Sequence, residues 1–275
     1  MRVFKIMIVD GKKIAQDIIS ELKRVIKKLE RSPKLFVVLV GQNNVTARYV
    51  SLKQKIAKKI GINVEIARFK ESVTTETLIQ AIKAAADTVD GIIVQLPLPS
   101  HIDKQAVLNT VPIELDVDVL GNASNEKFQK GTNTILPPVI ASINEILIRG
   151  NVNVNGKRAV VVGKGALVGR PAAVWLTNQG ADVVSLDSKS ENFVEEIQKA
   201  DIIVTGAGVP NLIKPDMIKY GVVLLDAATS ELEGSLVGDT SSACSAKASL
   251  YSPVPGGIGP ITIATLLNNL VLLSK

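Results

Sequence analysis

A glycine-rich segment, Gly163-Lys164-Gly165-Ala166-Leu167-Val168-Gly169, follows a predicted strand and opens a predicted helix. Glycines let a backbone come close to a pyrophosphate, and the amino end of a helix offers free amides and a positive dipole. The spacing is one residue longer than the usual dinucleotide fingerprint, and a tight turn without a ligand would give the same pattern. The segment therefore predicts a dinucleotide site, with a purely structural turn as the competing interpretation.

The identity of the dinucleotide depends on residues at the end of the next predicted strand. Asp187, 22 residues beyond Gly165, lies where a carboxylate takes a ribose hydroxyl, which favours NAD. Lys164 and the pair Ser188-Lys189 could instead hold a 2′-phosphate. Two lysines outweigh one carboxylate in charge, so the sequence favours NADP. NAD stays possible, because lysine lacks the bidentate fork with which arginine binds phosphate.

His101 is the only histidine, and its place after Pro99-Ser100 indicates a structural loop, so a lysine is a candidate acid or base. Tyr49 and Lys53 are spaced i, i+4 on a predicted helix and so share one face. A lysine beside an aromatic ring in a closed site gives up its proton more easily, because burial disfavours the charged form. Taken alone, such a pair is more typical of packing on a helix surface.

Three further segments place polar or rigid residues where ligands bind in α/β proteins. Gln95 ends an apolar strand within residues 90–99, where it could face a ligand or bond to a neighbouring loop. In Asp116-Val117-Asp118 a carboxylate could accept two hydrogen bonds from an amino-pyrimidine ring, or cap a helix or turn. The segment Pro253-Val254-Pro255-Gly256-Gly257-Ile258-Gly259-Pro260 is a rigid loop with little side chain, which lets a flat ligand approach the backbone.

The composition excludes several classes of function. Aromatic residues make up 3% of the chain, too few for a protein that stacks nucleic-acid bases. A single cysteine, Cys244, excludes an intramolecular disulfide and a cysteine-based zinc site, and indicates a reducing compartment. The lone histidine removes Ser-His-Asp catalysis and multi-histidine metal sites. Residues 1–10 show no signal-peptide pattern and the apolar stretches are too short to span a membrane, so we expect a cytoplasmic protein.

The formal net charge of +6 suits an anionic ligand such as a dinucleotide. The basic runs at 23–31 and 53–59 interleave with an apolar helical period, which indicates solvated helix faces.

Alternating helices and strands must position these residues. Apolar patterns predict strands at 35–40, 62–69, 91–96, 158–162, 181–186, 202–205 and 222–226, and helices at 46–60, 75–86, 138–149, 167–179, 191–199 and 260–273. Strands that are apolar throughout and alternate with helices are typical of parallel sheets covered on both faces. The sequence therefore predicts an α/β fold with two domains, connected by the helix at 138–149.

Together these segments resemble the bifunctional methylenetetrahydrofolate dehydrogenase/methenyltetrahydrofolate cyclohydrolase family over nearly the whole chain and in the same order. The most specific pieces are the 253–260 loop continuing into Ile261-Thr262, the 90–99 segment and the Tyr49/Lys53 helix. The resemblance implies a folate-binding domain at 1–137, completed by a carboxyl-terminal helix at 258–275. It also implies a Rossmann-like dinucleotide domain at 138–257, a cleft between the two domains, and a homodimer.

The resemblance assigns roles by position. It implies that Tyr49 stacks on the folate, that Lys53 is the catalytic lysine, that Gln95 tunes Lys53 and that Asp118 anchors the pterin. Further implied substrate-binding residues are Val94, Leu96, Pro255, Gly256 and Gly257, and the implied cofactor-binding residues are Gly163, Lys164, Gly165, Ser188 and Thr229. Thr46 stands where the family commonly has serine, and Val119 where it usually has glycine.

The activity implied is oxidation of 5,10-methylenetetrahydrofolate with NADP, then hydrolysis of the product to 10-formyltetrahydrofolate, in one-carbon metabolism. Hydride transfer needs orientation of the two reactants, and hydrolysis needs proton transfer, for which Lys53 is the candidate. A monofunctional dehydrogenase is the nearest alternative, against which Lys53 and Gln95 argue. Alternatives of other kinds are a catalytically silent cofactor-binding sensor and a Rossmann dehydrogenase for a different small acid.

Overall fold

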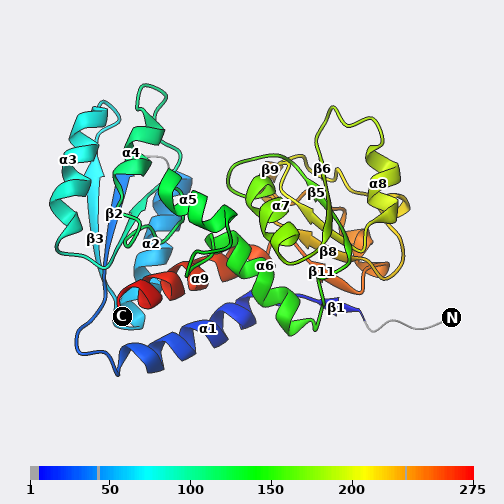
Figure 1. Ribbon diagram of the computed structural model, residues 1–275, viewed down its shortest axis with the longest axis horizontal. Coiled ribbons are helices and arrows are strands. Elements are labelled where there is room, and N and C mark those ends of the chain that lie inside the picture. The colour runs from blue at the N-terminus through cyan, green and yellow to red at the C-terminus, as the bar shows by residue number, and fades with distance from the viewer. Residues whose placement is uncertain (1–5, 42–43, 233) are drawn as a thin grey trace. The chain divides into compact units, whose positions relative to one another are not determined.

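The computed structural model describes residues 6–41, 44–232 and 234–275, which fall into two compact units (Figure 1). The Lys53 unit comprises Gln16–Pro138 and Ile263–Lys275. The Gly163 unit comprises the residues up to Ala15 and Val139–Thr262. The chain passes from one unit to the other within the helices α1 (Gly11–Ile26), α6 (Pro138–Arg149) and α9 (Ile258–Leu273).

The Lys53 unit is built on a parallel sheet with β2 (Lys34–Val40) in its centre, β3 (Asn63–Phe69) on one side and β4 (Gly91–Val94) on the other. Its other helices are α2 (Asn44–Lys59), α3 (Thr75–Ala86), α4 (Lys104–Thr110) and α5 (Asn122–Gln129). Because the strands run in one direction, their carboxyl ends share one edge of the sheet. Gln95 follows β4 at that edge.

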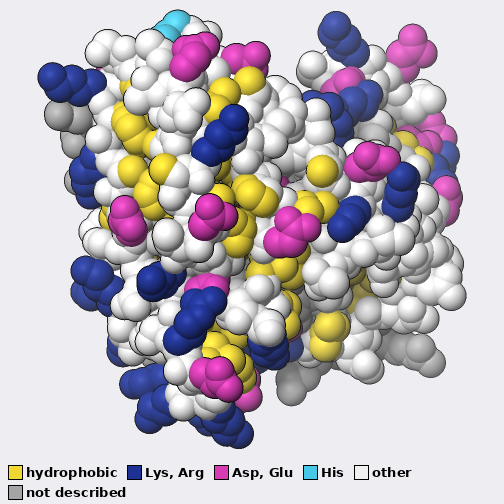
Figure 2. Space-filling view, turned by 60° about the vertical axis from the view of Figure 1, so that its left-hand side comes forward, with side chains coloured by type: hydrophobic (Ala, Val, Ile, Leu, Met, Phe, Trp, Pro, Cys, Tyr) yellow, Lys and Arg dark blue, Asp and Glu magenta, His cyan; other side chains and the backbone are white. Residues whose placement is uncertain are grey.

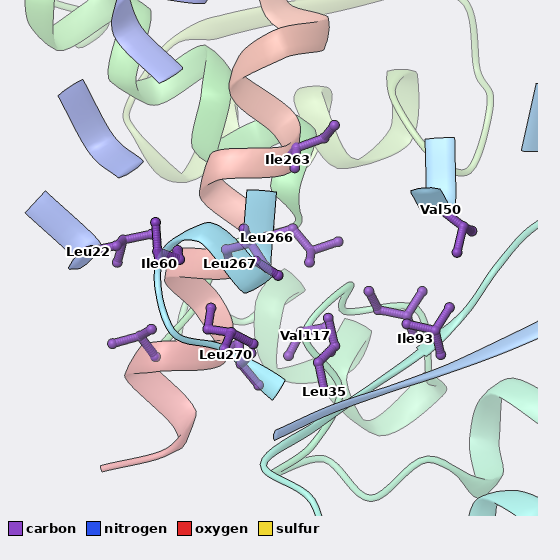
Figure 3. Packing of buried hydrophobic residues seen from close by; sticks show 14 of the residues in the cluster. Leu22, Leu35, Val50, Ile60, Ile93, Val117, Ile263, Leu266, Leu267 and Leu270 are labelled. Carbon is purple, nitrogen blue, oxygen red and sulfur yellow. The ribbon is translucent and has the colours of Figure 1, made fainter. Parts of the chain in front are cut away.

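Successive side chains of β2 enter two different cores, as the two-residue period of a strand dictates. Its odd-numbered residues, 35, 37 and 39, pack with residues of α1, α2 and α9. Its even-numbered residues, 36, 38 and 40, pack with residues of α3 and α4. Figure 3 shows the first core, in which Leu35 and Val117 lie beside Leu270 of α9. Helices therefore cover both faces, which explains why β2 is apolar from Leu35 to Val40.

The Gly163 unit has a parallel sheet with the strand order β1-β11-β8-β7-β5-β6. These strands are β1 (Met7–Ile8), β5 (Arg158–Val162), β6 (Asp182–Leu186), β7 (Ile202–Thr205), β8 (Val223–Asp226) and β11 (Leu250–Ser252). Around them lie α7 (Gly169–Asn178), α8 (Phe193–Lys199), the 3₁₀ turns η1 (Pro215–Met217) and η2 (Ser242–Ala246), and an antiparallel pair of β9 (Ser230–Leu232) and β10 (Ser235–Val237). The chain goes from β5 to β6 on one side and then to β7 on the other. The strand order thus reverses beside β5, where ligands bind in such sheets.

The predicted α/β class with parallel sheets is confirmed, and α3, α6, β5 and β7 have the predicted bounds. Helix α7 begins two residues later than predicted, at Gly169, because the preceding residues form the glycine-rich loop. Helices α4 and α5 were not predicted. The sequence of α5, NASNEKFQ, is polar and has no apolar period to reveal it. Among the described residues, no helix is both long and apolar enough to cross a membrane.

Candidate functional site

Lys53 and Gln95, which the sequence marked separately, meet at the carboxyl edge of the three-strand sheet. Lys53 lies on α2, and its Nζ donates a hydrogen bond to Gln95 Oε1 at 3.0 Å. Gln95 is itself fixed, because its Nε2 donates to the Leu96 carbonyl at 2.9 Å and its backbone N to the Val38 carbonyl at 3.0 Å. A lysine has donors but no acceptor, so the glutamine oxygen is the matching partner. Both side chains are partly buried, and the lysine nitrogen is therefore held at one position.

The two carboxylates of Asp116-Val117-Asp118 have different surroundings. Asp116 is buried and accepts hydrogen bonds from the backbone N of Leu120 at 3.3 Å and of Gly121 at 2.9 Å, so it caps a turn. Burial raises the pKa of the Asp118 carboxyl, nearby Asp116 raises it further, and the positive charge of Lys53 opposes both. Lys53 is therefore close enough for its charge to act on Asp118, which gathers Lys53, Gln95 and Asp118 into one cluster.

Val119 has a backbone φ of 57°, in the left-handed region that favours glycine. Its side chain is 1% exposed. Val119 thus adopts, at a cost in strain, a backbone conformation that suits glycine, and places a buried apolar group next to Asp118 in the chain.

Tyr49 lies on α2 one turn before Lys53, and 41% of its surface is exposed. Thr46, earlier on the same helix, is buried. Val94 is the buried last residue of β4, and Leu96 is partly buried. These residues belong to the elements that carry Lys53 and Gln95.

In the Gly163 unit two glycines are required by close backbone contacts. Gly163 has a φ of 100°, and a Cβ on it would lie 2.8 Å from the Gly206 carbonyl oxygen. A Cβ on Gly169 would lie 1.9 Å from the Gly163 carbonyl oxygen, so α7 can begin there with glycine alone. Gly165, in contrast, has open space where its side chain would be. The loops after β5 and β7 thus meet at the point where the strand order reverses.

Lys164 and Asp187 form an ion pair, although the sequence suggested that Lys164 favours NADP and Asp187 favours NAD. Lys164 Nζ lies 2.8 Å from Asp187 Oδ2, and this bond is the main reason that the pKa of Asp187 is lowered. Asp187 Oδ1 also accepts from the Lys189 backbone N at 3.0 Å and from Ser190 Oγ at 3.3 Å. Ser190 was missed by the sequence reasoning. Ser188 is exposed beside this pair.

Two buried aspartates, also missed, hold the loops that follow β7 and β8. Asp239 accepts from Thr205 Oγ1 and from the backbone N of Ala207 and Val209, both at 2.7 Å. Asp226 accepts from the Thr240 N and hydroxyl at 2.8 and 2.7 Å and from the Ala228 N at 3.1 Å, and burial raises its pKa. The sequence signal for Asp226 was its position as a polar residue at the end of an apolar strand. Thr229 is exposed on the second loop.

The Pro-Gly segment between β11 and α9 packs backbone against backbone. The Gly256 carbonyl accepts from the Gly11 N at 2.8 Å, and the Gly257 N donates to the Pro253 carbonyl at 2.8 Å. Gly256 has a φ of 104°, and a Cβ on Gly257 would lie 2.1 Å from Ser252 Oγ. Pro255 is exposed. The segment belongs to the Gly163 unit, and its glycines are needed for this close packing.

A basic hollow of about 510 Å³ lies at the opposite edge of the three-strand sheet from Gln95. Its lining includes Lys23 and Lys27 from the end of α1, and Lys58 and Lys59 from the end of α2. Lysines in the last turn of a helix offset its negative dipole end. All four are exposed, as predicted for solvated helix faces, and Figure 2 shows Lys and Arg side chains gathered at the lower left of the surface.

Two sequence models of a single family match the chain. The one described as "Tetrahydrofolate dehydrogenase/cyclohydrolase, catalytic domain" matches residues 9–118, and the one described as "Tetrahydrofolate dehydrogenase/cyclohydrolase, NAD(P)-binding domain" matches residues 137–275. The first match covers the Lys53, Gln95 and Asp118 cluster, and the second covers the glycine-rich loop.

Similar proteins span almost the same length. "Bifunctional protein FolD" of Hydrogenobaculum sp. (strain Y04AAS1) is 39% identical over 267 residues, 95% of this chain and 96% of that protein. The structure of the bifunctional enzyme FolD-methylenetetrahydrofolate dehydrogenase/cyclohydrolase from Campylobacter jejuni has a TM-score of 0.96 at 35% identity, covering 98% and 99% of the two chains. That of the Trypanosoma brucei dehydrogenase-cyclohydrolase, complexed with NADP cofactor and inhibitor, has a TM-score of 0.92 at 31% identity, covering 98% and 97%.

Proposed function

This chain belongs to the tetrahydrofolate dehydrogenase/cyclohydrolase family, and from that premise we propose how its residues divide the work between two reactions. The protein oxidises 5,10-methylenetetrahydrofolate with NADP and hydrolyses the resulting 5,10-methenyl cation to 10-formyltetrahydrofolate. The Lys53 unit binds the folate and the Gly163 unit binds the dinucleotide. The alternatives of a monofunctional dehydrogenase and of a silent sensor are not favoured, because relatives that match nearly end to end are named as bifunctional enzymes.

The residues around β5 fit a dinucleotide. Gly165 leaves open space beside the backbone, and the loop leads into the amino end of α7, where free amides favour a pyrophosphate. Lys164 would hold the 2′-phosphate, and Ser188 and Thr229 lie on exposed loops at the same edge. When bound, NADP supplies the acceptor for the hydride. The protein's contribution to this step is to orient the two reactants.

The hydrolysis needs a group that moves a proton, and Lys53 is that group. As the neutral amine, it accepts a proton from the water that attacks the methenyl carbon, and returns it to N5 of the folate as the bond between that carbon and N5 breaks. The second proton of the water leaves to solvent as the formyl C=O forms. Gln95 holds Lys53 in place through the 3.0 Å hydrogen bond, which is the observation that carries this proposal. Asp118 anchors the pterin, and Tyr49 stacks on the folate.

The exchange Lys53→Met tests the proposal, with Lys58→Met as the matched control on the exposed face of the same helix. Hydrolysis of methenyltetrahydrofolate is followed by its absorbance, and the dehydrogenase reaction at 340 nm with NADP and with NAD. We expect Lys53→Met to abolish hydrolysis while the protein still folds and binds folate, and Lys58→Met to behave as wild type. Near-normal hydrolysis by Lys53→Met would remove Lys53 from the mechanism. Failure of wild type to reduce NADP with methylenetetrahydrofolate would remove the function.

Assembly and location are proposals of the same kind. We infer a homodimer from the family resemblance, which sedimentation analysis would test directly. We infer a cytoplasmic location from the single cysteine, Cys244, which is buried and suits a reducing compartment. Fractionation of cells that make the protein would show where it resides.

A further inference from the structure

Asn269 is a buried polar residue on a helix that is otherwise largely apolar. It is 2% exposed and lies on α9 among Leu266, Leu267 and Leu270. Its side-chain Nδ2 donates to two backbone carbonyls, that of Val117 at 2.9 Å and that of Leu136 at 2.8 Å. A buried amide is costly unless it is hydrogen-bonded, so these two bonds explain how the helix tolerates it. Through these two bonds, Asn269 holds the backbone at Val117 and at Leu136 against α9.

The carbonyl of Val117 belongs to the same rigid peptide plane as the backbone N of Asp118. A hydrogen bond to that oxygen therefore restricts the rotation of the plane from which the Asp118 side chain projects. The Val117 side chain is fully buried beside Leu270, as Figure 3 shows, and a Cβ built on Gly91 would lie 2.6 Å from both side chains. Helix α9 thus fixes Val117 through an apolar contact and through a hydrogen bond.

The turn around Asp118 has further restraints of its own. Asp116 binds the backbone N of Leu120 and Gly121, and Val119 is held in the left-handed conformation. These restraints come from within residues 116–121, and the start of the turn is also tied to β4, where the Ile92 backbone N donates to the Leu115 carbonyl at 2.7 Å. Asn269 lies 152 residues from Val117 in the sequence and ties the turn to another part of the unit. Without it, the turn would keep its internal hydrogen bonds and its link to β4, but the peptide between Val117 and Asp118 would lose its hydrogen bond to α9.

We propose that Asn269 is a positioning residue for Asp118: it aligns the peptide before Asp118 and so directs the carboxylate at the pterin. The inference rests on the proposed role of Asp118 as the folate anchor. Asn269 itself touches no substrate in this scheme. Its effect should therefore appear in folate affinity and not in dinucleotide affinity.

The first experiment compares Asn269→Leu and Asn269→Ser with the control Thr265→Val. Thr265 is also buried on α9, one turn earlier, and its Oγ1 donates to the Pro138 carbonyl at 2.9 Å. Calorimetric titration with tetrahydrofolate and with NADP gives the two dissociation constants. We expect both Asn269 variants to bind tetrahydrofolate on the order of ten- to a hundredfold more weakly, the loss expected when hydrogen bonds to a charged group are misaligned. NADP binding, and both affinities of Thr265→Val, should stay within about twofold of wild type.

The second experiment places Asn269→Ser in an Asp118→Asn background. If Asn269 acts through Asp118, the added exchange has little further effect on folate affinity, because the group that it positions is already impaired. A full additional loss would overturn the inference while leaving Asp118 as the anchor. Equal loss of folate and NADP affinity, or the same loss in Thr265→Val, would assign Asn269 a merely structural role. Normal folate binding by Asp118→Asn alone would instead refute the proposed anchor. Asn269→Ser keeps the test usable if Asn269→Leu does not fold.

Discussion

Asp187→Asn should raise the preference for NADP over NAD, and Lys164→Ala should lower it. The two side chains form an ion pair of 2.8 Å at the carboxyl edge of the Gly163 unit's sheet. Asp187 is also fixed by the Lys189 backbone N and by Ser190, so it keeps its place when Lys164 moves. A ribose hydroxyl would donate to Asp187, whereas a 2′-phosphate would be repelled by Asp187 and bound by Lys164. The pair thus contains the acceptor that suits NAD and the cation that suits NADP.

The magnitude follows from the exposure of the pair. The Lys164 side chain is 51% exposed and that of Asp187 is 35% exposed, so water and salt screen their attraction strongly. A phosphate carries more charge than one carboxylate, and Lys164 should therefore exchange Asp187 for the 2′-phosphate as its ion-pair partner. Loss of Lys164 should weaken NADP binding by about tenfold or more, the contribution expected of one hydrogen bond to a charged group. NAD binding should change little, because Asp187 remains to accept the hydroxyl.

The pH dependence has a definite sign. Because Lys164 and the Lys189 backbone lower the pKa of Asp187, the carboxylate stays ionised at neutral and mildly acidic pH. Asp187 itself should therefore add no pH dependence to the wild-type cofactor preference across that range. Below the lowered pKa, protonation of Asp187 should act in the same direction as Asp187→Asn.

The assay is the rate of absorbance change at 340 nm with methylenetetrahydrofolate, from which kcat/KM is obtained for each cofactor. Wild type and both variants are compared with Lys157→Ala, which removes an exposed lysine next to the amino end of β5, at the other edge of the same sheet. The control should keep the wild-type ratio. A shift of both site variants in the same direction, or a wild type that prefers NAD, would refute the reasoning.

Three further results are expected. Asp118→Asn should weaken tetrahydrofolate binding by about tenfold while NADP binding stays near wild type in parallel titrations, because charge-assisted hydrogen bonds are the stronger kind; equal loss of both would indicate a structural Asp118. Val119→Gly should be at least as stable to urea as Val119→Ala, because a left-handed φ costs alanine roughly 1–2 kcal/mol and the greater freedom of unfolded glycine costs about 0.5–1 kcal/mol; a clearly weaker glycine variant would contradict this. Cys244 should react slowly with iodoacetamide at pH 8 until the protein is unfolded, because burial raises the pKa of its thiol to about 11, and rapid labelling of native protein would show otherwise.

Most helices and strands that carry the site could be predicted from local spacing. The apolar run of β2 and the i, i+4 pair Tyr49 and Lys53 depend on residues a few positions apart, and so does the glycine loop. The contact between Lys53 and Gln95 depends instead on strand order, because β4 must lie next to β2 and α2 must cover one face. Sequence spacing marked both residues but could not show the 3.0 Å bond between them.

Sequence spacing also could not show that Lys164 and Asp187 are partners, and in the sequence the two residues therefore favour different cofactors. Each follows a different strand, and their pairing requires that β5 and β6 be neighbours whose carboxyl ends coincide. Because Lys164 is paired with Asp187, the preference for NADP cannot be inferred simply by counting two lysines against one carboxylate. The phosphate competes with an existing partner for Lys164, so selectivity depends on a difference between two interactions.

Gln95 and Asp226 show what the structure adds to the search for a site. Both are polar residues at the carboxyl end of an apolar strand, and sequence reasoning has no means to separate them. Asp226 is bonded to backbone N–H groups and to a threonine hydroxyl, and such a carboxylate holds a loop in place. The side-chain oxygen of Gln95 accepts a hydrogen bond from the side-chain nitrogen of Lys53, a group that can exchange protons with a bound molecule. The chemical nature of the partner, more than the position on the strand, therefore identifies Gln95 as part of the reactive cluster and Asp226 as part of the framework.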